Sequence, residues 1–349
     1  MEFYARISYR MKNNPVIVFP KKQTAEIQYR EIKQPGSGEL LVKNHKSLIS
    51  IGTEMTAFSG DYPAGSVWET FFPYPFDAGY ATAGEVIGTG EGVDKSWLGK
   101  RVGTMAPHCR YAVVSTEDVR IVHRTEISDE EAVFYIIAQI VMRGIRMSKV
   151  GWGDTAVVFG MGLLGHFAAC FCRLSGAKPV FAVDTADFRL DLMPNDKSLL
   201  KINPLKSDLL EDVKINTAGR MADIVFEVTG SAKLIPDEFK VLHEQGRFVM
   251  MSSPRDKTDF DFHDLCNRPS HTIIGAHNFS HPKFATYENP WTAVRHCELF
   301  FDLVADGELD VKRMISHRID YKNAPEVYYQ LLKDRSQYMG IVIDWENAE

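Results

Sequence analysis

The sequence has few cysteines, no strong excess of positive charge and no long apolar run. Its five cysteines are scattered and form no C-x-x-C pair, which argues against a disulfide framework and favours reduced thiols in a cytoplasmic setting. No stretch of about 18 apolar residues is present, so we expect no membrane span. The net charge of −6 offers no broad basic surface, so nucleic acid is not an expected partner.

What is present is the composition of a globular protein with an alternating α/β segment in its second half. The chain has 349 residues, of which 45% are hydrophobic and 25% charged, enough for two domains with sizeable cores. Before about residue 130, short β-type runs are separated by turns that contain proline, glycine and lysine. The fold class we expect is therefore α/β, with a β-rich region placed before a parallel sheet.

The strongest local signal is a strand, a glycine-rich turn and a helix in direct succession. Thr155–Phe159 reads as a buried strand, and the glycines that follow it have the spacing G-x-G-x-x-G. Apolar residues then recur at helical spacing, and a second strand, Pro179–Val183, leads into Asp184. This order predicts a Rossmann dinucleotide site; a tight turn in an unrelated α/β protein is the alternative.

Each part of this motif has an expected role toward a dinucleotide. The glycines allow a tight turn and a close approach of the backbone to the pyrophosphate, and the first helical amides favour its negative charge. Asp184 is placed to accept the ribose hydroxyls and to repel a 2′-phosphate, which predicts NAD as the cofactor. The expected pyrophosphate contacts are Gly160, Gly162, Leu163, Leu164 and Gly165.

The whole chain resembles the medium-chain dehydrogenase/reductase superfamily. The resemblance rests on a β-rich N-terminal region, a pair of helices, and the run K-V-G-W-G-D-T-A-V-V-F-G-M-G-L-L-G. Gly52-Thr53-Glu54 is similar to the family's C-G-T-D segment, and Gly79–Val86 to its G-H-E-x-x-G-x-V segment. Glu227–Gly230 resembles the family's loop beside the nicotinamide, which would place Thr229 and Gly230 near that ring. Gln139, at the end of the helix that faces the glycine motif, is either a contact to the nicotinamide side or a helix-surface amide.

This resemblance implies an architecture and an assembly. We expect a doubly wound Rossmann sheet over residues 141–279. A discontinuous GroES-like catalytic domain would consist of residues 1–140 together with 280–349. In the family, the last strand of the Rossmann sheet, here His271–Ala276, forms a dimer edge, so the expected state is a homodimer.

The chain departs from the family where zinc would bind. Zinc-dependent members use a cysteine, a histidine and a third ligand, and the matching positions here hold Ile51, Tyr80 and about Tyr135. An isoleucine has no lone pair to offer, and a neutral tyrosine is a poor zinc ligand. We therefore expect a member without metal, similar to the branch of cyclic or sugar-like alcohol and bacteriochlorophyllide dehydrogenases.

Without zinc, a side chain must take the proton from the substrate hydroxyl. Tyr80 is the first candidate, although a phenol needs a nearby cation to act as a base at neutral pH. Glu54 beside Thr53 is the second candidate, and Tyr135 is the third. The alternative is structural: both tyrosines would fill the vacated site as core aromatics, and Glu54 would form a salt bridge. An aromatic loop at 62–76 would either stack on a ring-shaped substrate or simply pack.

The sequence predicts an NAD-dependent enzyme that interconverts a secondary alcohol, cyclic or sugar-like, and its ketone. A second hypothesis is an enone or quinone reductase, which also needs no metal but usually takes the phosphorylated cofactor that Asp184 would repel. A third is a non-catalytic protein that binds the cofactor. The fold by itself does not distinguish the three hypotheses.

Overall fold

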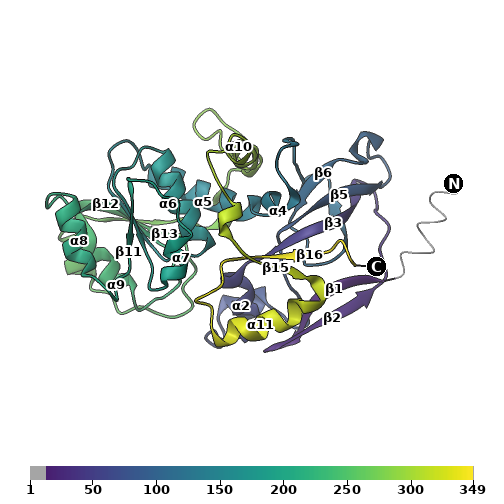
Figure 1. The fold of residues 1–349 in the computed structure, drawn as a ribbon, viewed down its shortest axis with the longest axis horizontal. Coiled ribbons are helices and arrows are strands. Elements are labelled where there is room, and N and C mark those ends of the chain that lie inside the picture. The colour runs from purple at the N-terminus through teal and green to yellow at the C-terminus, as the bar shows by residue number, and fades with distance from the viewer. Residues whose placement is uncertain (1–12, 349) are drawn as a thin grey trace. The chain divides into compact units, whose positions relative to one another are not determined.

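The computed structural model of the chain describes residues 13–348 and divides them into two compact units. Unit 1 runs to Ile136 and resumes at Cys297, and unit 2 is Ile137–His296. The expected divisions follow residues 140 and 279. The observed divisions fall inside two helices, α5 (Tyr135–Ser148) and α10 (Ala293–Ala305), so each of these helices belongs to both units. In Figure 1 unit 2 holds the teal and green strands, and unit 1 the purple and yellow ones.

Unit 2 is built on a six-stranded sheet in which every neighbouring pair is parallel. The strand order is β11-β10-β9-β12-β13-β14. Numbered along the chain from β9, this is the Rossmann order 3-2-1-4-5-6, with a switch point between β9 and β12. Its strands are β9 (Ala156–Phe159), β10 (Val180–Val183), β11 (Leu199–Ile202), β12 (Ala222–Glu227), β13 (Leu242–Met250) and β14 (Thr272–Gly275).

The central strands of this sheet are apolar along their whole length because helices cover both faces. All four residues of β9 and of β10 are buried. Helix α6 packs on both strands, and Phe167 and Phe171 on its inner face stack at 5.6 Å between ring centres. The other helices of the unit are α7 (Asp187–Asp191), α8 (Leu209–Asn216) and α9 (Ile235–Glu238).

Unit 1 contains a seven-stranded sheet of order β15-β16-β3-β5-β6-β8, with β7 paired to β3, and a small sheet of order β2-β1-β4. All pairs except β15 with β16 are antiparallel. The strands are β1 (Asn14–Lys21), β2 (Thr24–Arg30), β3 (Glu39–Ile49), β4 (Phe76–Asp77), β5 (Thr82–Thr89), β6 (Arg101–Thr104), β7 (Tyr111–Ser115), β8 (Arg120–Ile121), β15 (Ile315–Asp320) and β16 (Gly340–Asp344).

One helix of unit 1, α4, begins at a side-chain cap. The predicted capping box at Ser128 is confirmed: its side chain accepts from the Glu131 amide while the Glu131 carboxylate accepts from the Ser128 amide. The helices lying wholly in this unit are α2 (Ile51–Ser59), α3 (Val67–Phe71), α4 (Asp129–Ala132) and α11 (Ala324–Lys333). The expected Rossmann sheet with a β-rich second part is therefore confirmed.

The aromatic loop of unit 1 packs rather than standing open. Phe72 is buried and stacks on Trp68 at 5.9 Å, with Phe76 edge-on at 5.2 Å. Phe72 belongs to an apolar cluster with residues of α2, α11 and β16, and Trp68 and Phe76 pack against that cluster. Of the two alternatives for this loop, these contacts favour packing.

Candidate active site

The glycine-rich turn after β9 has the shape that a dinucleotide requires. Gly160 has a φ of +93°, a conformation that residues with a side chain rarely adopt. A Cβ on Gly165 would lie 1.8 Å from the Gly160 carbonyl oxygen, so only glycine allows this close packing of helix and strand. A Cβ on Gly162 would meet nothing within 4 Å. The space beside Gly162 is therefore open on the side from which a pyrophosphate would approach.

Helix α6 (Leu163–Leu174) begins at this turn without a cap. Its N-cap residue is Gly162, no side chain bonds to the first amides, and the first turn carries no acidic residue. Leu163 and Leu164 therefore place uncapped amides at the positive end of the helix dipole. This arrangement fits an anionic group such as a pyrophosphate.

Asp184 follows β10 and is tied to the same turn. Its Oδ2 accepts from the Met161 amide at 2.7 Å, its Oδ1 accepts from the Ala186 amide at 2.8 Å, and Arg189 Nη1 lies 3.5 Å from Oδ2. The side chain is 7% exposed. Each carboxylate oxygen keeps a second lone pair, so the group still has acceptors for ribose hydroxyls.

The loop after β12 is organised by Glu227, a residue whose role the sequence did not reveal. Its buried carboxylate accepts from the Thr229 amide and hydroxyl, both at 2.7 Å, and from the Gly230 amide at 2.9 Å. The other oxygen of the carboxylate bonds the Ser252 hydroxyl beyond β13. Thr229 and Gly230 are thus held at the carboxyl end of β12, next to the sheet's switch point.

Gln139 on α5 is buried, and its Oε1 has no hydrogen-bond partner among the described residues. A buried amide oxygen without a partner is costly unless something donates to it. A carboxamide would be such a donor. The glycine turn, the uncapped helix, Asp184 and Gln139 therefore suit a nicotinamide dinucleotide, which supplies or accepts hydride when bound.

In unit 1, the Tyr80 hydroxyl lies 2.7 Å from the Ser50 hydroxyl. Burial raises the pKa of Tyr80 above its ordinary value; hydrogen bonds with Ser50 and Thr53 oppose this shift, and the charge of Glu54 adds to it. Tyr80 is thus a neutral phenol at pH 7. None of the groups that shift its pKa is the cation that a base of this kind would need.

Glu54 is buried in a network whose members are distant in the sequence. Its Oε1 accepts from the Ser50 amide at 2.7 Å, and its Oε2 accepts from the Tyr328 hydroxyl at 2.5 Å and lies 3.0 Å from His108 Nε2. The side chains of Glu54 and His108 are 1% and 0% exposed. Glu54 therefore holds Ser50 in place through its backbone, and its oxygens are already occupied. His108 and Tyr328 were not among the predicted site residues.

Tyr135 packs among core residues of unit 1. Its ring lies against Gly103, where a Cβ would come within 2.6 Å of it, and tilts on Phe301 at 6.3 Å. Burial raises its pKa, and its hydroxyl has no hydrogen-bond partner among the described residues. These contacts agree with the core interpretation. Over residues 13–348, no group of three or more His, Cys, Asp or Glu side chains is placed to hold a metal ion.

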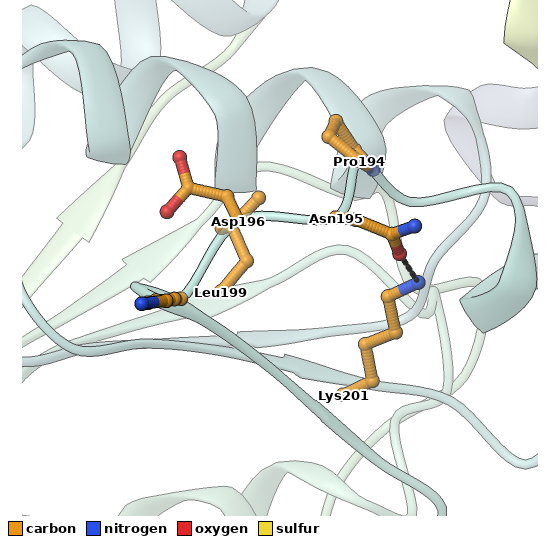
Figure 2. Close-up of a pocket in the computed structure, with 6 residues that line it drawn as sticks. Pro194, Asn195, Asp196, Leu199 and Lys201 are labelled. Carbon is orange, nitrogen blue, oxygen red and sulfur yellow. Dashed lines mark hydrogen bonds between the residues drawn. The ribbon is translucent and has the colours of Figure 1, made fainter.

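Unit 2 also has a surface pocket away from these residues, shown in Figure 2. Lys201 points across it to the Asn195 side chain and donates to the Met193 carbonyl at 3.0 Å. Asp196 is bonded by Ser198. The pocket contains none of the predicted site residues. The lining residues are Pro194, Asn195, Asp196, Lys197, Leu199 and Lys201.

Comparison with known proteins agrees with this architecture. Residues 164–292 match a family model described as zinc-binding dehydrogenase. D-guloside 3-dehydrogenase of Escherichia coli strain K12 is 24% identical over 316 residues, which cover 83% of this chain and 89% of that protein. L-galactonate-5-dehydrogenase of the same strain is 21% identical over 361 residues, which cover 95% of this chain and 99% of that protein.

A solved structure shows the same fold. An E. coli short chain alcohol dehydrogenase in complex with NADH superposes with a TM-score of 0.78 at 17% identity, over 95% of this chain and 99% of that one. The family match and these relatives support the expected resemblance to the medium-chain dehydrogenase/reductase superfamily, and the fold is that of the zinc-type alcohol dehydrogenases. The similarity to these dehydrogenases supports an oxidoreductase. No helix within the described part of the chain is long and apolar enough to cross a membrane.

Proposed function

We propose that this protein is a zinc-independent, NAD(H)-dependent oxidoreductase that interconverts a secondary alcohol and its ketone. The observation that carries the proposal is the Tyr80–Ser50 pair, with hydroxyl oxygens 2.7 Å apart. Tyr80 of this pair occupies the position where zinc-dependent relatives would have the histidine ligand of the metal. The substrate class we propose is a cyclic or sugar-like polyol, because relatives that match most of the chain are named as dehydrogenases of a guloside and a galactonate.

The pair can move a proton without a metal. During ketone reduction, the neutral phenol of Tyr80 donates its proton to the carbonyl oxygen as hydride reaches the carbon. The Tyr80 phenolate that this leaves accepts a hydrogen bond from the Ser50 hydroxyl, which opposes the raised pKa of Tyr80, and a proton from solvent then restores the phenol. Alcohol oxidation is the reverse: the phenol first releases its proton to solvent, and the phenolate, hydrogen-bonded by Ser50, accepts the proton of the substrate hydroxyl as hydride leaves the carbon.

Zinc independence is part of the proposal and has its own support. In zinc-dependent relatives the three metal ligands would stand at positions before the glycine turn. Those positions hold Ile51, Tyr80 and Tyr135, and neither an aliphatic side chain nor a neutral phenol is a good ligand for zinc.

The choice of NAD is supported by the Asp184 carboxylate, which is held beside the glycine turn by the Met161 amide. A second negative charge, on a 2′-phosphate, would be repelled there. Assembly as a homodimer is supported by β14, which lies at the edge of the unit 2 sheet with three of its four residues exposed. An exposed edge strand is commonly covered by a partner.

The raised pKa of Tyr80 also favours a second candidate, an enone or quinone reductase, because that reaction needs a proton donor rather than a base. Activity assays distinguish the two. Purified protein with NAD+ and a panel of cyclic polyols, sugar acids and glycosides should show turnover, and elemental analysis should find well under one zinc per chain. Turnover of enones alone would favour the second candidate. Turnover that a chelator abolishes would contradict zinc independence.

A further inference from the structure

Three arginines of unit 2, which we call the arginine cluster, gather near one tryptophan and one histidine. They are Arg143, Arg146 and Arg295. The guanidinium carbons of Arg146 and Arg295 lie 3.2 and 3.9 Å from the centre of the Trp291 ring. Both guanidinium groups are thus in cation–π contact with the Trp291 ring, against which the His296 ring also stacks at 5.3 Å.

A chain of hydrogen bonds fixes Arg146 further. Arg146 Nε donates to His296 Nε2 at 3.0 Å, so His296 must carry its proton on Nδ1, which lies 3.0 Å from His281 Nε2. Burial, together with the positive charges of neighbours that include all three arginines, lowers the pKa of His296 to about 3. His296 is thus neutral. It accepts the hydrogen bond from Arg146 and so orients that side chain, but it provides no negative charge.

The arginine cluster has no carboxylate partner. Within residues 13–348, none of its three guanidinium groups forms an ion pair with an acidic side chain. Arg143 and Arg146 bond the protein only through Nε, Arg143 to Ser280 Oγ at 3.2 Å. Their terminal amino groups make no hydrogen bond to the described residues. Arg295 has one long contact, 3.5 Å to the Pro290 carbonyl.

The cluster lies near the edge of the sheet where α/β proteins bind ligands. Gly144, beside Arg143, is in contact with Met251 at the end of β13, and Ser280 follows soon after β14. The carboxyl ends of parallel strands form the usual ligand edge of such a sheet. Arg146 and Arg295 are exposed there, so their terminal amino groups can reach a small molecule.

We propose that the arginine cluster is a binding site for the oxyanion of a small molecule, either a carboxylate or a phosphate group. Guanidinium groups bind both through paired hydrogen bonds. An oxyanion would supply the acceptors that the terminal amino groups lack and would offset the repulsion between the two charges on Trp291. The site contains no residue of the glycine turn, and it does not depend on the proposed reaction.

The test is a titration of the full chain with inorganic phosphate and, separately, with malonate, at constant ionic strength set with chloride. Tryptophan fluorescence is the readout because the Trp291 ring is in contact with two of the guanidinium groups. We expect a saturable change that disappears in Trp291→Phe, a variant that keeps an aromatic face. Arg146→Gln and Arg295→Gln should each weaken binding at least tenfold, since each removes a charged hydrogen-bond donor. Arg220→Gln, an exposed arginine of the same unit, is the matched control and should change binding less than twofold.

The two titrations separate the sources of the oxyanion. Saturation by phosphate alone would assign the site to a phosphate ester, and saturation by malonate alone would assign it to an acid. A response to neither, or one that persists unchanged in both arginine variants, overturns the proposal. So does a change of molecular mass in Arg295→Gln without any anion response, because the cluster would then be a subunit contact. Thermal melting checks that each variant is folded, and Arg146→Lys replaces Arg146→Gln if the latter is not.

Discussion

Replacing Glu238 with glutamine should change how the stability of unit 2 depends on pH. Glu238 is the last residue of α9 and is 1% exposed, and neither carboxyl oxygen has a hydrogen-bond partner among the described residues. Burial, with the negative charges of Glu227 and Asp237, raises its pKa from 4.5 to about 9. The folded protein therefore keeps this carboxyl protonated at neutral pH, whereas the unfolded chain ionises it.

The sign of the effect follows from this difference in bound protons. Between pH 4.5 and about 9, folded Glu238 holds a proton that the unfolded chain has released. Its contribution to stability is complete below pH 4.5 and is lost as the pH rises toward 9, by about 1.4 kcal/mol per unit. From pH 5.5 to 7.5 the loss is about 3 kcal/mol. Glu238→Gln removes this titration, so the variant should gain that amount relative to wild type over the same interval.

Urea unfolding read by hydrogen exchange in peptides of β12 and β13 reports on unit 2 by itself. Wild type, Glu238→Gln and the exposed control Glu244→Gln should be compared at pH 5.5, 6.5 and 7.5. The control should parallel wild type, and Glu238→Gln should not. Parallel curves for all three proteins would refute the reasoning, since the buried carboxyl would then be ionised in the folded state.

Three further predictions concern the cofactor and the assembly. Gly162→Ala should weaken binding of NAD at least tenfold and leave the melting temperature unchanged, because the added Cβ enters open space. Gly165→Ala should instead lower the melting temperature, because its Cβ would lie 1.8 Å from a carbonyl oxygen. Calorimetry and thermal melts measure the two effects, and the reverse pattern would contradict the assignment. NAD should bind at least tenfold tighter than NADP, about 1.4 kcal/mol, and Asp184→Ser should reduce that preference; equal affinities in wild type would refute it. Ile273→Lys on β14, at a side chain that is 44% exposed, should shift the sedimentation mass from dimer to monomer, and a wild-type monomer would exclude the proposed edge.

Local sequence patterns predicted the Rossmann part of the fold well. The strand, glycines and helix at 155–174 and the cap at Ser128 are encoded by neighbouring residues, so spacing alone indicates them. Asp184 could be placed at the end of its strand for the same reason, although its bond to the Met161 amide depends on the folded turn.

The surroundings of Tyr80 could not be predicted in this way. Glu54 is joined to Tyr328, 274 residues along the chain, and to His108, 54 residues along. No local period encodes such pairs, and a lone histidine without ligand spacing gives no signal. The tilt of Tyr135 onto Phe301 depends likewise on a distant segment of the chain. Local spacing also could not indicate that Glu227 holds the loop after β12, since its second partner, Ser252, follows another strand.

The most direct test of the proposed mechanism is the turnover number of Tyr80→Phe at saturating cofactor and substrate. Loss of a proton-transfer group typically lowers the rate by about 10²–10⁴-fold. We predict a fall of at least about a hundredfold, with NAD affinity and melting temperature unchanged, and a smaller fall in Ser50→Ala. Tyr29→Phe, an exposed tyrosine of the same unit, should retain full turnover. If Tyr80→Phe turns over within a few-fold of wild type, Tyr80 is not the proton-transfer group and the proposed mechanism is wrong.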